Sequence, residues 1–240
     1  MEAQRSTGGT ATVLPRWILG FGAFAILFFM ASQVTAFTIS PAERDMGNLQ
    51  KILYVHVPAA WISMVSYFLV FVASIGYLWR GRERLDLFAA SAAEAGVVLT
   101  GLTLALGSIW GRSTWGTWWE WDPRLTSTAV LFLVFVGYLS LRGFIEDDVR
   151  RARWSAAIGI LGFLNVIIVY YSVQWWRGIH QTQSSPETLS PMYTLGLRMN
   201  AFAFLFLMIL FVSVRYHTAV LERGAEAREE EEALAGAAHV

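Results

Sequence analysis

A run of tryptophans is the segment whose side chains most clearly point to a ligand. Trp115, Trp118, Trp119 and Trp121 lie close together in one short stretch. Tryptophan anchors membrane proteins at both interfaces, but this many indoles in one connection exceed what anchoring requires. Flat π faces bind planar, mostly apolar ligands by stacking, and exposed apolar patches often mark binding sites. We therefore predict that this segment is a platform for a planar ligand.

The tryptophan run is followed by an acidic and a basic residue. Asp122 precedes Pro123, a pair that favours a turn or the first residues of a helix. Its carboxylate therefore either caps a helix or contacts the ligand, and the sequence leaves both alternatives open. Arg124 can bind a carboxylate through paired charge-assisted hydrogen bonds. Both residues are candidate ligand contacts.

Histidine is the side chain of this sequence best suited to binding a metal. There are no cysteines, which excludes disulfides and thiolate metal sites. His56 and His180 each lie near one end of a long apolar stretch, whereas His217 and His239 lie toward the C-terminus. Neutral imidazole is a good axial ligand for iron. Two axial imidazoles beside an indole platform describe a haem site, provided that the fold brings both to one face.

The composition indicates which elements position these residues. Hydrophobic residues make up 55% of the 240 residues and charged residues only 15%, against roughly 25% charge in soluble domains. The formal net charge of +0 gives no reason to expect a nucleic-acid partner. A membrane-spanning helix needs about 20 mostly apolar residues. Six stretches meet this requirement, and they predict an all-α fold, a polytopic membrane protein with a bundle of six transmembrane helices: Trp17–Phe37, Val55–Trp79, Phe88–Trp110, Leu125–Leu141, Trp154–Trp176 and Leu197–Tyr216.

The distribution of lysine and arginine predicts the orientation of these spans. The two ends of the chain and the connections after spans two and four carry twelve of these residues, and the other connections carry six. Because positive charge concentrates in cytoplasmic segments, both termini are expected in the cytoplasm. The predicted domains are a cytoplasmic segment 1–16, a six-helix membrane domain 17–216 and an acidic cytoplasmic tail 217–240. Outer loops at about 111–124 and about 177–196 then carry the tryptophans and His180.

Three polar residues within the spans need an explanation, because such residues are often functional. Glu94 either has a functional role or pairs with a neighbouring helix, whereas Asn165 and Gln33 are expected to form hydrogen bonds between helices. The first span could also be a cleavable signal, but its apolar run is longer than a signal core, so we expect a retained helix.

Two other classes of protein compete with a haem-handling function. A b-type cytochrome subunit for electron transfer places pairs of histidines inside its spans, and no predicted span contains two. A permease for haem or another solute needs polar residues or broken helices near the middle of the membrane. The spans offer little beyond Glu94 and Asn165 for that purpose.

Three segments resemble one known family. Residues 115–126, with the sequence WGTWWEWDPRLT, resemble the signature of the haem-handling proteins with a tryptophan-rich WWD domain. Residues 54–60, YVHVPAA, and residues 171–181, which begin YSVQWW and end IHQ, resemble the short six-helix branch of that group. That branch is CcmC, or haem exporter protein C, of the bacterial cytochrome c maturation system. The three motifs occur in the same order as in that family.

The resemblance implies a function and a set of contacts. A member of this family binds haem b on the periplasmic side of the bacterial inner membrane, with His56 and His180 as axial ligands and the WWD loop as the platform. It presents the haem for covalent loading onto the periplasmic chaperone CcmE, in a complex with the ATPase CcmA and the membrane proteins CcmB and CcmD. It is a haem-transfer protein rather than an enzyme. Three routes of haem to the site stay open: through this chain, through a partner protein, or sideways from the lipid.

Overall fold

The protein is a bundle of long helices. A computed structural model describes residues 14–180 and 191–237, and in these ranges the only β-structure is an isolated bridge between Glu43 and Gly47. Six helices within these described ranges are long and apolar enough to cross a membrane, which confirms the predicted all-α fold. Their bounds are α1 (Arg16–Val34), α2 (Leu53–Arg80), α3 (Glu83–Trp115), α4 (Pro123–Phe144), α5 (Asp148–Trp175) and α6 (Pro191–Ala237), with a short π-helical turn at Thr35–Ile39 and a 3-10 turn at Asn48–Ile52.

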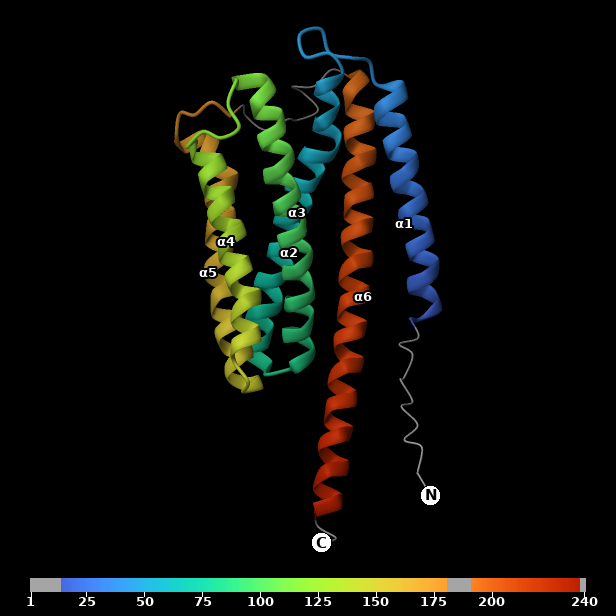
Figure 1. Ribbon diagram of the computed structural model, residues 1–240, viewed down its shortest axis with the longest axis vertical. Helices are drawn as coiled ribbons and strands as arrows, with labels where there is room; N and C mark the ends of the chain where they lie inside the picture. Colours follow the sequence, from blue (N-terminus) through green and yellow to red (C-terminus); the bar gives the residue numbers. More distant parts are fainter. Residues whose placement is uncertain (1–13, 181–190, 238–240) are drawn as a thin grey trace, which may run out of the picture.

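Helix α2 lies at the centre of the bundle. It packs against α3, α5 and α6, while α4 packs against α5 and α3 (Figure 1). Helix α1 packs mainly against α6 at the edge of the bundle (Figure 1). The helices alternate in direction, so the first residue of α1 and the last residue of α6 lie at the same end (Figure 1). We call this end the inner end and the opposite end the outer end.

Small residues allow the central helices to approach one another closely, as is usual in membrane proteins. The ring of Tyr67 on α2 lies directly against Gly96 on α3, where a Cβ atom would collide with it. The same ring stacks on Phe135 of α4 with 3.8 Å between ring centroids. Its hydroxyl is within 2.9 Å of the Thr100 hydroxyl. One buried tyrosine therefore joins three helices.

Ion pairs hold the inner half of the bundle together. Arg142 on α4 binds both carboxylate oxygens of Asp86 on α3, at 2.6 and 2.8 Å. Glu94 on α3 accepts two hydrogen bonds from the guanidinium of Arg215 on α6. Two alternatives were considered for Glu94, and the structure shows it paired with a neighbouring helix, α6. That ion pair anchors α6 to α3.

The two amide side chains expected to link helices do so. Gln33 on α1 donates to Oδ1 of Asn200 on α6, and Ser32 donates to the same oxygen at 3.2 Å. Asn165 on α5 donates to the carbonyl oxygen of Ser127 on α4 at 2.8 Å. Asn200 is fully buried and is the centre of the contact between α1 and α6.

Replacing Asn200 with alanine should loosen α1. The change removes the acceptor shared by Ser32 and Gln33 and leaves the half-buried Gln33 amide without this partner. We expect a loss of about 1–2 kcal/mol in stability, measured as a lower midpoint of thermal unfolding in detergent. Asn165→Ala removes a single interhelical hydrogen bond and should cost less. Equal midpoints for Asn200→Ala and the wild type would contradict the assigned role.

Helix α6 continues far beyond the other helices at the inner end (Figure 1). Its 47 residues correspond to a length of about 70 Å at 1.5 Å per residue, whereas the hydrocarbon core is only about 30 Å thick. The segment from residue 217 to Ala237 is helical, and its acidic residues Glu229–Glu232 are exposed. The division between membrane domain and acidic tail at residue 217 therefore falls within one continuous helix and stays a prediction.

Candidate functional site

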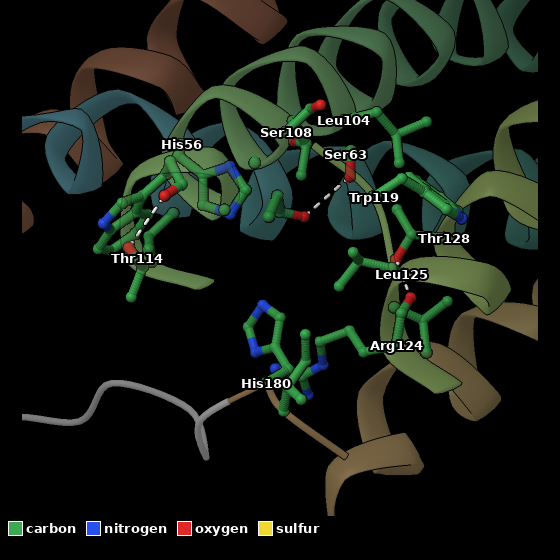
Figure 2. Close-up of a pocket in the computed structure, with 18 of the residues that line it drawn as sticks. His56, Ser63, Leu104, Ser108, Thr114, Trp119, Arg124, Leu125, Thr128 and His180 are labelled. Atoms are coloured by element: carbon green, nitrogen blue, oxygen red, sulfur yellow. Dashed lines mark hydrogen bonds between the residues drawn. The ribbon is translucent and has the colours of Figure 1, made fainter. Parts of the chain in front are cut away.

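The outer half of the bundle contains a cavity enclosed by α2, α3 and α4, with contributions from α5 and from the segment after α5 (Figure 2). It encloses about 1350 Å³ of empty space, counted out to its open mouth. Most of its lining is apolar or aromatic, with a small number of hydroxyl groups, which is the usual composition of a ligand site. The tryptophans, histidines and arginine that line it are Trp61, Trp110, Trp115, Trp119, His56, His180 and Arg124.

His56 reaches this cavity from the first turns of α2. Its ring lies edge-on to Trp110 of α3, with 5.8 Å between centroids and an interplanar angle of 84°. A Cβ atom at Gly107 would lie 2.9 Å from Cε1 of His56. The glycine therefore provides the space that the imidazole occupies, and His56 is held by two regular helices.

His180 reaches the cavity from the opposite part of its wall, after the end of α5 (Figure 2). Helix α5 ends at Trp175, so His180 belongs to an irregular segment. Its ring lies 6.0 Å from the ring of Trp115, at an angle of 62°. The structure thus brings both histidines predicted from the sequence into one cavity, each beside a tryptophan of α3.

The tryptophan loop folds back over the end of α3. Helix α3 ends at Trp115, and Gly116 follows with φ of +81°, a left-handed conformation that favours glycine. The Ser108 hydroxyl donates to the carbonyl oxygen of Trp118 at 2.7 Å, and the Thr117 hydroxyl donates to that of Trp119 at 2.9 Å. The first bond fixes the loop against α3, which carries part of the cavity wall, and the second stabilises the turn within the loop.

The predicted platform divides into two halves. Trp115 and Trp119 line the cavity, whereas Trp118 and Trp121 do not. Trp118 is 59% exposed and Trp121 is 82% exposed at the outer end. The Trp121 ring contacts the Trp119 ring edge-on, with 5.8 Å between ring centroids. The loop therefore presents two indoles to the cavity and two to the outside.

Asp122 caps α4, the structural alternative considered for this residue. Its Oδ1 accepts hydrogen bonds from the backbone N–H groups of Arg124, at 2.9 Å, and Leu125, at 3.4 Å. Pro123 occupies the first helical position, where its missing N–H costs nothing. The carboxylate is buried and does not line the cavity.

Arg124 lies in the cavity wall on the same side as His180 (Figure 2). Its Nη2 donates to the carbonyl oxygen of Tyr170 on α5 at 3.1 Å, which ties the start of α4 to α5. Its Nε is buried and has no hydrogen-bond partner in the part of the chain that the structure describes. Arg177 and Lys51, two other basic residues near the outer end, are not part of the cavity wall.

Among the described residues, three buried polar atoms in the cavity wall have no hydrogen-bond partner. They are Nδ1 of His56, Nε1 of Trp119 and Nε of Arg124. A buried polar group without a partner costs about 1–3 kcal/mol, so such groups usually have a functional explanation. An imidazole acceptor, an indole donor and a guanidinium donor around an aromatic cavity are suited to a flat ligand that carries a metal and carboxylates.

Several residues of the cavity wall were not singled out from the sequence. Trp61 and Met64 follow His56 on one face of α2, and Gly107 and Trp110 lie on the facing side of α3. Trp61 and Met64 are three residues apart on α2, as are Gly107 and Trp110 on α3, and this helical spacing is the signal that could have identified them. Met46 carries no such signal, because it comes from an irregular loop.

The loop that carries Met46 is ordered by a carboxylate. Glu43 accepts hydrogen bonds from the backbone N–H groups of Met46 and Asp45, both at 2.8 Å. These bonds lower the pKa of Glu43 below its usual value, and the bond from Met46 has the larger effect. The Met46 sulfur accepts a hydrogen bond from Nε1 of Trp110 at 3.5 Å. The first outer loop therefore closes one side of the cavity.

Comparison with known proteins identifies the family. The family model described as Heme exporter protein C matches residues 5–231. The chain belongs to the haem exporter protein C family. The protein of that name from Bradyrhizobium diazoefficiens is 36% identical over 219 residues, which cover 89% of this chain and 81% of the relative. Those from Escherichia coli K12 and Rhodobacter capsulatus are 34% and 32% identical over 85% and 91% of this chain, and over 84% and 91% of the relatives.

Membership of the haem exporter protein C family assigns the chain a role in haem handling for cytochrome c maturation. It confirms the family predicted from the tryptophan and histidine motifs. Together with the six apolar helices, it makes the chain a multi-pass membrane protein that handles haem. The outer cavity is the candidate for the haem site.

Proposed function

We propose that the protein holds haem b in the outer cavity and presents it on the periplasmic face of the inner membrane for covalent attachment to CcmE. His56 and His180 bind the iron, Trp115 and Trp119 stack against the macrocycle, and Arg124 binds a carboxylate. The observation that carries the proposal is the convergence of two imidazoles in one aromatic cavity at one end of the bundle. The proposed partners in the complex are CcmA, CcmB and CcmD.

In this proposal the protein contributes position and the cofactor contributes reactivity. His56, in a regular helix, and His180, in the segment after α5, orient the haem relative to the outer surface. The exposed indoles Trp118 and Trp121 lie at the outer end, the side from which a periplasmic partner would approach. No residue of the cavity is assigned a covalent step, so we propose a haem-transfer protein rather than an enzyme.

The charge pattern supports the proposed orientation. The inner end carries the arginines of the α2–α3 and α4–α5 connections and the long acidic extension of α6. Positive charge in short connections favours the cytoplasm, which supports a cytoplasmic location for both termini and a periplasmic location for the cavity. The rival electron-transfer function needs histidine pairs within the spans. In the parts of the chain that the structure describes, His56 and His180 share one cavity, which suits a single haem.

Coexpression with CcmE tests the proposed transfer. CcmE isolated from cells that also contain the full chain should retain haem on a denaturing gel stained for haem, because the attachment is covalent. Cells carrying the double variant His56→Ala/His180→Ala should give unlabelled CcmE at equal membrane levels of the variant. Haem extracted from the full chain by acidified acetone should be haem b. Equal labelling by the double variant would overturn the proposal.

Arg124→Gln should weaken haem binding without abolishing it. The change removes a charge-assisted hydrogen bond to a carboxylate, for which we expect about a tenfold loss of affinity. Titration of haem into the purified chain measures the effect. Arg177→Gln is the matched control, because Arg177 is exposed on the same face outside the cavity wall. Equal losses in the two variants would indicate a general effect of charge and would contradict the contact.

A further inference from the structure

The carboxylate of Asp122 binds two segments that are far apart in the sequence. While Oδ1 caps α4, Oδ2 accepts hydrogen bonds from the backbone N–H groups of Ile179, at 2.9 Å, and His180, at 3.4 Å. Asp122 is only 6% exposed. A helix cap needs one oxygen, so the second oxygen and its two bonds are explained by the segment that carries His180.

Gly178 shows that this contact is closely packed. A Cβ atom at Gly178 would collide with Oδ2 of Asp122 and would lie 3.4 Å from Cδ of Pro123. The last helical hydrogen bond of α5 runs from the N–H of Trp176 to the carbonyl oxygen of Ser172. Beyond it, the N–H groups of residues 179 and 180 no longer have helical partners, and Asp122 provides their acceptor.

The two histidines of the cavity are therefore held in different ways. His56 lies within α2. Its ring contacts Trp110 and occupies the space beside Gly107. The backbone of His180 lies in an irregular segment whose amides are bound by one carboxylate. Hydrogen bonds from N–H groups to a buried carboxylate are among the stronger ones in proteins. The position of His180 thus depends on Asp122, whereas that of His56 depends on helix packing.

We infer that Asp122 is the positioning residue for His180, and that it acts by binding the backbone amides of residues 179 and 180. The inference rests on the proposed haem site, to which it adds a residue that fixes one of the two ligands. It also implies that the packing of α2 fixes the iron ligand His56, whereas the iron ligand His180 is held by a separate contact that a single substitution removes.

Two pairs of variants isolate this contact. Asp122→Ala removes the carboxylate, and Gly178→Ala keeps it but forces it away from the amides. Asp147→Ala is the control for the first, because Asp147 caps α5 through the N–H of Arg150 without bonding to a distant segment. Gly143→Ala is the control for the second, because a Cβ atom there meets nothing within 4 Å.

Hydrogen exchange in the haem-free full chain provides the first readout. Amides 179 and 180 should exchange at least about tenfold faster in Asp122→Ala and in Gly178→Ala than in the wild type. They should be unchanged in Asp147→Ala and Gly143→Ala. Unchanged exchange in both test variants would overturn the inference. This readout needs no haem, so it stands or falls independently of the proposed function.

The absorption spectrum at saturating haem provides the second readout. Asp122→Ala and Gly178→Ala should reproduce the high-spin spectrum expected of His180→Ala, and added imidazole should restore the low-spin spectrum. A role limited to capping α4 would leave the spectrum as in the wild type and would overturn the inference. If His180→Ala itself has the wild-type spectrum, the proposed haem site fails, while the exchange result still decides the contact.

Discussion

Replacing His56 or His180 with alanine should lower the affinity for haem by at least about a hundredfold, because each change removes an iron ligand. Replacing a residue that only hydrogen-bonds to a metal ligand already lowers metal affinity or activity 10–100-fold. At haem concentrations high enough to fill the site, the remaining imidazole should give a five-coordinate, high-spin spectrum in place of the six-coordinate, low-spin one. Titration of the purified chain, followed by absorption of the Soret band, measures both effects.

His217→Ala is the matched control for these two variants. His217 belongs to the part of α6 near the inner end and is not part of the cavity wall. Its replacement should leave affinity and spectrum unchanged. A low-spin spectrum that persists in either His56→Ala or His180→Ala would show that the iron has another ligand and would contradict the proposed coordination.

Gly107→Val should lower haem affinity ten- to a hundredfold, although residue 107 is not an iron ligand. A Cβ atom at this position would already lie 2.9 Å from Cε1 of His56, and valine adds two further methyl groups. The imidazole must then turn away from its place beside Trp110. The same titration measures the loss, and the spectrum at saturation should resemble that of His56→Ala.

The stability of the fold should change little in Gly107→Val, because the residue faces the cavity rather than the packed core. Gly137→Val is the control, since a Cβ atom at Gly137 on α4 meets nothing within 4 Å. Both variants should unfold at similar temperatures, and only Gly107→Val should lose haem. Loss of haem in both, or in neither, would contradict the specific role of Gly107.

The convergence of the two histidines could be predicted because it follows from topology. An apolar stretch of about 20 residues has to cross the membrane, so successive connections alternate between its faces. His56 and His180 each lie at the outer end of a span, and counting spans is enough to put them on one side. Their approach within a single cavity needed the packing of α2 against α3 and α5.

The division of the tryptophan run could not be predicted in the same way. Whether an indole faces the cavity or the outside is decided by the path of the loop after Gly116, and that path depends on single hydrogen bonds such as the one from Ser108 to the carbonyl of Trp118. Asp122 illustrates the same limit. Its role as a helix cap has a local signature in the following proline, but its bonds to residues 179 and 180 join segments that no local pattern connects.

The most direct test of the central claim counts the histidine nitrogens bound to iron. The full chain, with all histidines labelled with nitrogen-15, is loaded with ferric haem and studied by pulsed electron paramagnetic resonance. We expect two strongly coupled axial nitrogen-15 nuclei in the wild type and also in His217→Ala. One coupled nucleus, or none, in the wild-type chain would contradict a haem held between His56 and His180.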